Sequence, residues 1–387
     1  MMTSDFVSPR VAALPPSPTI AVAKKAEELR RQGIDVVDFG PGEPDFDTPE
    51  HARRAAIEAI EAGMTHYPPG RGLPELRESI AEKLERENGV RYDPMEVIVT
   101  PGAKQAILEA VFVSSRPGDE VVIFDPGWGS YDAIVRLAGA TPVHVQLHPD
   151  FTIDTGALRD ALSPRTRSVI VGTPSNPTGH VLGGEELEIL ADVCTANDLL
   201  LISDEIYERI SYGETPISPA TLAGMQERTV TVNGFSKAYA MTGWRLGYAA
   251  APRDFVDAML KVHEHSVTAA ASFVQVGGIA ALRGPQEPIR MMVEEFARRR
   301  EIVVEGLNRL PGVSVSPPDG AFYAFPDISG TGLSGTELAF RLLECGVAVT
   351  PGAGFGDDWD THIRLSFATG EDRIRAGLER MGEILSR

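Results

Sequence analysis

A lysine and an arginine lie eight residues apart, just after an apolar run, in the stretch TVNGFSKAYAMTGWRLGY (231–248). The β-branched residues 229–232 predict a buried strand, and Lys237 follows the point where that strand runs out. An amine placed there, among glycine, serine and aromatic residues, is a candidate for covalent chemistry with a carbonyl compound. Arg245 can bind a phosphate group through a fork of N–H donors that lysine cannot copy.

Further polar and aromatic side chains follow the other predicted strands, and open parallel sheets hold their ligands beyond the carboxyl ends of their strands. Gly102 permits a turn into a helix whose first N–H groups favour an anion such as phosphate. Trp128 can stack on a flat ligand, and Asn176 can donate and accept hydrogen bonds. Asp204 leaves a buried strand, where a carboxylate needs a partner, and Tyr207 follows it. Taken singly, these residues also fit ordinary turns, a core tryptophan or a helix N-cap.

Together these residues supply a phosphate cradle, an aromatic plate, a buried carboxylate, a phenol and an amine at one end of one sheet. A phosphorylated, planar, nitrogen-containing ring that forms a Schiff base would use all of them. Pyridoxal 5'-phosphate is such a ligand. The sequence therefore predicts a pyridoxal-phosphate site.

Apolar runs that alternate with helical patterns must position these residues. The runs after which the candidates lie are EVIVT (96–100), EVVIFD (120–125), RSVIVG (167–172), LLLIS (199–203) and TVTV (229–232), and WRLGYAAA (244–251) is a further candidate strand. Because the runs are continuously apolar and helical patterns separate them, they predict an α/β fold with a mainly parallel sheet covered on both faces. Residues 204–210 also read as a helical pattern, and residues 267–282 read as a buried helix.

The pattern changes near residue 283, where a long charged helix (288–310) precedes short strand-like runs. These runs are GVSVS (312–316), AFYAF (321–325), GVAVT (346–350) and HIRLSFA (362–368). We predict a large domain at residues 46–282 and a smaller α+β domain made of residues 1–45 and 283–387.

The composition limits the class of partner. The 387 residues carry a formal net charge of −19, which argues against nucleic acid or an anionic membrane as the main partner. Cys194 and Cys345 give neither a disulfide framework nor metal-ligand spacing, so the cytoplasm is the expected compartment. The proline-broken start does not read as a signal peptide, and no run is long enough to span a bilayer.

In its motifs, the chain resembles the fold-type I pyridoxal-phosphate aminotransferases, particularly the bacterial aspartate aminotransferase branch of class I/II. The matching stretches are GEPDFDTPEH (42–51), YPPGRGLPELRE (67–78), PGAKQA (101–106), SNPTG (175–179), SDEIYE (203–208), SKAYAMTGWRLGY (236–248), GAFY (320–323) and HIRLSFA (362–368). The resemblance implies a sheet of the seven-stranded type and an enzyme that moves an amino group between an L-amino acid and a 2-oxo acid.

The resemblance also implies roles around the cofactor ring. Lys237 is the Schiff-base lysine and the proton carrier, and it needs a lowered pKa for that work. Asp204 holds the ring nitrogen protonated, while Tyr207 and Asn176 hydrogen-bond the phenolic oxygen. Trp128 stacks on the ring and, with Asn176, borders the substrate.

Other matched residues are expected around the cofactor phosphate. Ala103 and Lys104 offer backbone amides, and Arg245 clamps the phosphate group. Family members often carry a phosphate-binding hydroxyl at the position of Gly234, and Ser236 is the candidate to replace it.

The remaining matches concern the substrate and the subunit partner. Arg364 is expected to grip the substrate α-carboxylate with help from the backbone at Gly42. Tyr67 is expected to reach the cofactor phosphate of the neighbouring subunit, which implies a homodimer with shared sites.

The choice of substrate stays open at this point. The branch favours aspartate and 2-oxoglutarate, and Lys104 or another cation could meet a second carboxylate. Gly127 and Gly129 stand where relatives often have bulkier groups, which predicts a roomier pocket. Aromatic, alanine or specialised biosynthetic substrates remain alternatives, as do a β-lyase, decarboxylase or oxidase reaction and a non-enzymatic regulator that binds the cofactor.

Three other motifs are expected to carry no chemistry. Residues 330–335 match the dinucleotide fingerprint GxGxxG, but the next strand ends in Thr350 rather than in an acid that would hold a ribose. Residues 263–265 (HEH) do not face one another on a helix. The aspartates of residues 357–360 fit a solvated loop, so no metal is expected.

Overall fold

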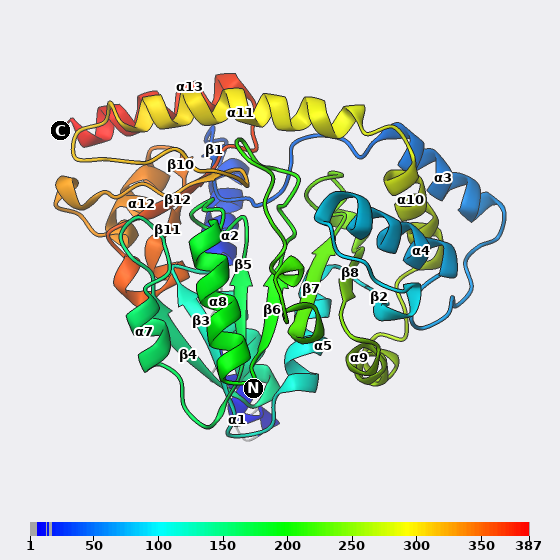
Figure 1. Ribbon diagram of the computed structural model, residues 1–387. Coiled ribbons are helices and arrows are strands. Elements are labelled where there is room, and N and C mark those ends of the chain that lie inside the picture. The colour runs from blue at the N-terminus through cyan, green and yellow to red at the C-terminus, as the bar shows by residue number, and fades with distance from the viewer. Residues whose placement is uncertain (1–5, 13, 15–17, 387) are drawn as a thin grey trace.

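The computed structural model describes residues 6–12, 14 and 18–386, and a seven-stranded sheet lies at its centre (Figure 1). In spatial order the strands are β2 (Val97–Thr100), β8 (Gly247–Ala250), β7 (Thr229–Gly234), β6 (Leu200–Asp204), β5 (Thr166–Gly172), β3 (Glu120–Asp125) and β4 (Thr141–Gln146). Neighbouring strands are parallel except that β8 runs antiparallel to both β2 and β7. The predicted mainly parallel α/β sheet is confirmed.

Successive strand residues face opposite helical layers, as the pleat of a sheet requires. One core cluster joins Ile98, Ile123 and Ile202 to α5 (Ala103–Ser114) and α9 (Arg253–Ser266). The opposite face packs against other helices, and these are α8 (Gly184–Ala196), α7 (Thr155–Asp160), α4 (Pro74–Lys83) and α10 (Ser272–Arg283). Helix α6 (Ser130–Ala138) belongs to the first layer, and α3 (Glu50–Glu61) packs against α10. Burial on both faces explains the continuously apolar strand sequences.

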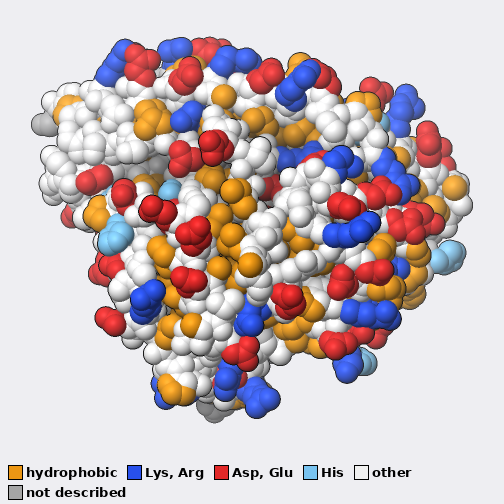
Figure 2. All heavy atoms as spheres, in the orientation of Figure 1, with side chains coloured by type: hydrophobic (Ala, Val, Ile, Leu, Met, Phe, Trp, Pro, Cys, Tyr) orange, Lys and Arg blue, Asp and Glu red, His pale blue; other side chains and the backbone are white. Residues whose placement is uncertain are grey.

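The C-terminal part forms small sheets under two long helices. Strand β1 (Val37–Asp38) pairs with β10 (Val347–Ala348), and β12 (Ile363–Ser366) lies between β11 (Thr350–Pro351) and β9 (Tyr323–Ala324). The helices of this part, with those of the described N-terminal segment, are α11 (Glu287–Leu307), α12 (Gly335–Glu344), α13 (Glu371–Leu385), α1 (Pro9–Ala12) and α2 (Pro18–Arg31). Figure 1 shows α11 and α13 side by side along one edge, and Figure 2 shows acidic and basic side chains interspersed there. The proposed domain division at residues 46 and 283 stays a prediction.

The structure corrects several local predictions. Residues 206–209 form turns rather than a helix, and the Glu205 N–H just before them donates to Val232 O (2.8 Å) on the neighbouring strand β7. Residues 312–316 contribute only the isolated bridge Ser314–Asp327 and not a strand. Strand β4 was not identified, since it lies at the edge of the sheet and only Pro142 and Val145 of its six residues are buried. Within the described ranges, every helix is too short or too polar to cross a bilayer.

Candidate active site

A pocket of about 440 Å³ opens beyond the carboxyl ends of β5 and β6 and reaches β9 and β12. All but one of the residues predicted for the site line it, and these are Gly42, Ala103, Lys104, Trp128, Asn176, Asp204, Tyr207, Ser236, Lys237, Arg245 and Arg364. The exception is Tyr67, whose side chain is 90% exposed and lies outside the pocket of its own chain. Strand-end placement therefore brings together residues that are far apart in sequence.

Lys237 extends its amine into the middle of this pocket. Its Nζ donates a hydrogen bond to Gly42 O and lies 5.5 Å from the centre of the Tyr207 ring. Burial lowers the pKa of Lys237 to about 8, and the positive charge of Arg364 adds to the effect. The residue therefore reaches its neutral, nucleophilic form close to physiological pH.

Asp204 ends β6 and is buried beneath the pocket. Its Oδ2 accepts a hydrogen bond of 2.8 Å from the Tyr131 hydroxyl, and the Ile206 N–H donates to its Oδ1 (3.3 Å). Burial raises the pKa of Asp204 to about 6, against the lowering effect of these hydrogen bonds. The positive charge of Lys237 lowers this pKa, but no described residue forms an ion pair with Asp204, so a cationic ring nitrogen would supply the missing partner.

The phosphate cradle predicted at the start of α5 has a suitable shape. Gly102 has a φ of +89°, and a Cβ there would lie 2.8 Å from the Arg245 guanidinium. The backbone of β8 also presses on this turn, since a Cβ on Gly247 would lie 2.4 Å from Ala103 N. The first N–H groups of a helix lack intrahelical acceptors, so this end of α5, with Arg245 beside it, fits a phosphate group.

The missing hydroxyl at Gly234 has a steric explanation. A Cβ at this position would meet Gly247 Cα and Leu246 O, each at 3.0 Å. Ser236 lines the pocket and remains the candidate hydroxyl beside the phosphate.

Arg364 lies on β12, 3% exposed, at the other end of the pocket. Its guanidinium donates to Asn176 Oδ1 (2.9 Å) and to Gly40 O (2.7 Å). Its Nε is buried without a hydrogen-bond partner, and no carboxylate pairs with it in the described part of the chain. Burial also lowers its pKa. A buried cation without a counter-ion fits a substrate carboxylate.

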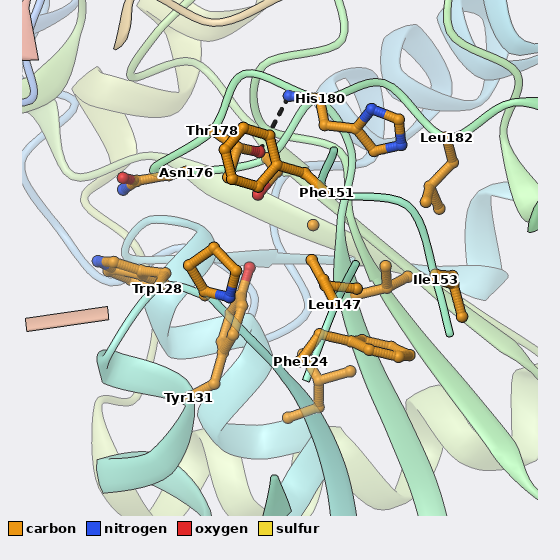
Figure 3. Close-up of a pocket in the computed structure, with 16 residues that line it drawn as sticks. Phe124, Trp128, Tyr131, Leu147, Phe151, Ile153, Asn176, Thr178, His180 and Leu182 are labelled. Carbon is orange, nitrogen blue, oxygen red and sulfur yellow. Dashed lines mark hydrogen bonds between the residues drawn. The ribbon is translucent and has the colours of Figure 1, made fainter. Parts of the chain in front are cut away.

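A second, smaller hollow of about 40 Å³, drawn in Figure 3, adjoins the main pocket. The two share Trp128, Tyr131, Gly172 and Asn176, and Figure 3 shows Trp128 and Tyr131 next to each other at the edge of this hollow. The expectation that Gly127 and Gly129 make the pocket roomier is wrong. A Cβ on Gly127 would lie 2.2 Å from Phe124 O, and one on Gly129 would lie 2.9 Å from Gly354 O. Backbone, not open space, occupies the positions of the missing side chains.

Eight residues that line the pocket were not predicted as members of the site, and four of them have side chains that can form hydrogen bonds. Tyr131 is the second residue of α6 and lies three residues after Trp128, and Tyr323 belongs to the recognised GAFY stretch. Glu43 accepts a hydrogen bond from Thr242 Oγ1 (2.8 Å), and both residues line the pocket. Glu43 follows Gly42 and Thr242 lies three residues before Arg245, and this closeness to predicted site residues was the signal in the sequence.

The three excluded motifs have structural roles in the described chain. The glycines of residues 330–335 allow close packing, since a Cβ on Gly330 would lie 2.8 Å from Gly312 Cα. His263 is buried against Glu109, with Nδ1 and Oε1 2.8 Å apart. Asp360 accepts a hydrogen bond from the Thr336 N–H (2.9 Å). In residues 6–12, 14 and 18–386, no three metal-binding side chains gather at one point.

Comparison with known proteins agrees with this geometry. The sequence profile described as "Aminotransferase class I and II" matches residues 34–381. An aspartate/prephenate aminotransferase of Thermus thermophilus is 45% identical over 98% of this chain and 99% of its own. An aspartate aminotransferase of Geobacillus stearothermophilus is 43% identical over 97% and 98% of the two chains. A solved aspartate aminotransferase from Thermus thermophilus, with maleate, has a TM-score of 0.93 at 45% identity and covers 98% of this chain and 99% of its own. The predicted fold type is thereby confirmed. The chain belongs to the class I and II aminotransferases, in the branch of the bacterial aspartate aminotransferases.

Proposed function

We propose that this aminotransferase binds pyridoxal 5'-phosphate in the 440 Å³ pocket and uses aspartate and 2-oxoglutarate as its substrates. The observation that carries the proposal is a buried amine and a buried guanidinium, Lys237 and Arg364, which open into one pocket without a carboxylate partner. When bound, the cofactor supplies an aldehyde that condenses with amines and a ring that accepts the electron pair released at the substrate α-carbon.

The residues of the chain then bind, orient and move protons. Arg364 binds the α-carboxylate, with the backbone near Gly42 at its side. Lys237, with its lowered pKa, takes the proton from the α-carbon and returns it to the cofactor side. Asp204 would keep the ring nitrogen protonated, while Tyr207 and Asn176 would donate hydrogen bonds to the phenolic oxygen.

The phosphate is held at the start of α5. Ala103 and Lys104 offer backbone N–H groups, Arg245 and Ser236 offer side-chain donors, and Trp128 covers the ring. Contacts at the phosphate and over the ring would together fix the orientation of the reacting atoms.

Lys104 favours aspartate as the donor. Its Nζ lies 4.7 Å from the centre of the Trp128 ring. Burial lowers the pKa of Lys104, and the positive charge of Arg245 adds to the effect. It forms no ion pair within the described residues, so a second carboxylate at the substrate side chain would neutralise it. Lys104 and Arg364 line the same pocket, so each could bind one carboxylate of a dicarboxylic amino acid, and the names of the relatives agree with aspartate.

The proposal includes a homodimer in the cytoplasm. The exposed Tyr67 would reach the cofactor phosphate of the neighbouring subunit, and the domain of residues 1–45 and 283–387 would carry Arg364 against the larger domain of residues 46–282. The net charge of −19 agrees with small-molecule substrates rather than nucleic acid.

The test is the visible absorption of the purified protein during titration with single amino acids. Aspartate is expected to abolish the absorption of the bound cofactor with release of one equivalent of 2-oxo acid, and 2-oxoglutarate is expected to restore it. Phenylalanine, alanine and, as acceptor, prephenate test the other substrate classes. A protein that gains no visible band with added pyridoxal phosphate contradicts the cofactor assignment. Release of ammonia or carbon dioxide, or uptake of oxygen, would instead indicate a lyase, a decarboxylase or an oxidase.

A further inference from the structure

Tyr323 lies between the two ends of the pocket and contacts a functional group at each. Its side chain is 1% exposed and belongs to β9, which pairs antiparallel with β12. In that register Tyr323 is opposite Ser366, so Arg364 is its diagonal neighbour on the same face of the sheet. The position follows from pairing between strands that are forty residues apart.

The hydroxyl of Tyr323 contacts the hydroxyl of Tyr207 at 2.8 Å. Both groups are buried, and burial raises both pKa values, so each hydroxyl stays protonated near neutral pH. A Cβ on Gly42 would lie 2.5 Å from the Tyr323 hydroxyl, so the backbone at Gly42 packs directly against this hydroxyl. When Tyr323 donates to the Tyr207 oxygen, the proton of Tyr207 is free to point into the pocket.

The ring of Tyr323 holds Arg364. The guanidinium carbon lies 4.5 Å from the centre of the Tyr323 ring and 5.0 Å from that of Phe355. With two N–H groups fixed by Asn176 and Gly40, these rings restrict the plane in which the guanidinium can lie. The remaining N–H groups of Arg364 are then oriented to bind a carboxylate from one direction.

We infer that Tyr323 is a positioning residue that orients the Tyr207 hydroxyl through its own hydroxyl and the Arg364 guanidinium through its ring. One side chain thereby orients the protein groups at both the reacting end and the carboxylate end of a bound amino acid. The inference rests on the proposed function, since both ends are defined by the cofactor and an α-amino acid.

Two variants of the holoenzyme separate the two contacts. Tyr323→Phe removes the hydroxyl and keeps the ring, whereas Tyr323→Leu removes both. The first readout is the pH midpoint of the visible absorption of the bound cofactor. The second is the dissociation constant of succinate, a dicarboxylate without an amino group, measured through the same absorption.

Tyr323→Phe is expected to raise the pH midpoint by roughly half a unit or more, which is the size of one lost hydrogen bond. Without the Tyr323 hydroxyl, the Tyr207 hydroxyl donates a weaker hydrogen bond, which leaves more negative charge on the phenolic oxygen of the cofactor. That charge would stabilise the proton that the bound cofactor loses at the midpoint, so the midpoint rises. Its succinate affinity should change by less than about threefold. Tyr323→Leu is expected to show the same midpoint shift and an affinity about tenfold weaker.

The matched control is Tyr92→Phe, since Tyr92 is also buried, with a hydroxyl contact to Thr231 (3.4 Å), but lies outside the pocket. It should leave both readouts at parent values. A parent-like midpoint in Tyr323→Phe would overturn the inference while leaving the proposed function intact. A parent protein without any cofactor absorption would overturn both.

Discussion

The Tyr131 hydroxyl donates a 2.8 Å hydrogen bond to the Asp204 carboxylate, and both side chains are buried beneath the pocket. No ion pair joins Asp204 to a cation within the described residues. Burial therefore dominates and raises the pKa of Asp204 to about 6, although Tyr131 and Lys237 oppose the shift. The apoprotein thus contains a carboxylate that is costly to ionise until a cationic group lies against it.

This cost predicts how Asp204→Asn changes the stability of the apoprotein with pH. The pKa of Asp204 in the folded chain lies above its ordinary value of 3.8, so the ionised form destabilises the fold as the pH rises through about 6. The variant should be more stable than the parent by about 2–3 kcal/mol at pH 7.5, with the difference vanishing near pH 4. Urea unfolding at the two pH values measures this, with the exposed Asp254→Asn as control. A variant less stable than the parent at pH 7.5 would contradict the prediction.

Lys237 gives a prediction about the pH dependence of covalent cofactor capture. Because burial lowers its pKa to about 8, the neutral amine predominates above that pH. The rate at which apoprotein and pyridoxal phosphate form the visible band should rise with pH, reach half its maximum near pH 8 and level off above that pH. A rate that continues to rise toward pH 10 would indicate an ordinary surface lysine.

Lys237→Ala should remove the covalent visible band while some cofactor still binds noncovalently. We expect turnover to fall on the order of 10⁴-fold, since the proton carrier is lost as well. The exposed Lys261→Ala is the control and should behave like the parent. Parent-like turnover in Lys237→Ala would show that another residue carries the chemistry.

Arg364→Lys tests the recognition of the α-carboxylate. Lysine keeps the charge but lacks the forked guanidinium. In Arg364 this group contacts Asn176 and Gly40 and still has N–H groups left for a carboxylate. We expect kcat/KM for amino acids to fall about 100-fold, within the range for disrupting a buried charge pair. Arg341→Lys on the exposed side of α12 is the control. Equal kcat/KM values in Arg364→Lys and the parent would exclude this role.

Much of the candidate site could be predicted because its residues follow the carboxyl ends of parallel strands. Asp204 and Lys237 lie just beyond or at the ends of continuously apolar strands, and parallel strands bring such ends to one edge. Sequence patterns specify these strands strongly since both faces are buried. The half-exposed edge strand β4 lacked that signal and was not identified.

The contacts of Tyr131 and Tyr323 could not be predicted in this way. Both depend on packing between segments distant in sequence, namely α6 against β6 and β9 against β12. The glycines at 127 and 129 illustrate the same limit. Sequence shows that a side chain is missing, but only the packing shows that backbone fills the space.

Lys104 provides the prediction that separates aspartate from neutral donors. Its Nζ lies over Trp128 in the pocket, partly stripped of water and without an ion-pair partner among the described residues. Lys104→Gln should therefore lower kcat/KM for aspartate by roughly tenfold or more, because one charge-assisted contact is lost. The same change should lower kcat/KM for phenylalanine or alanine by less than about threefold, since their side chains carry no charge. Backbone amides at residues 103 and 104 are retained, so the phosphate site is preserved, and unchanged cofactor affinity verifies this. Equal losses for aspartate and the neutral donors would assign Lys104 to the cofactor rather than to the substrate side chain.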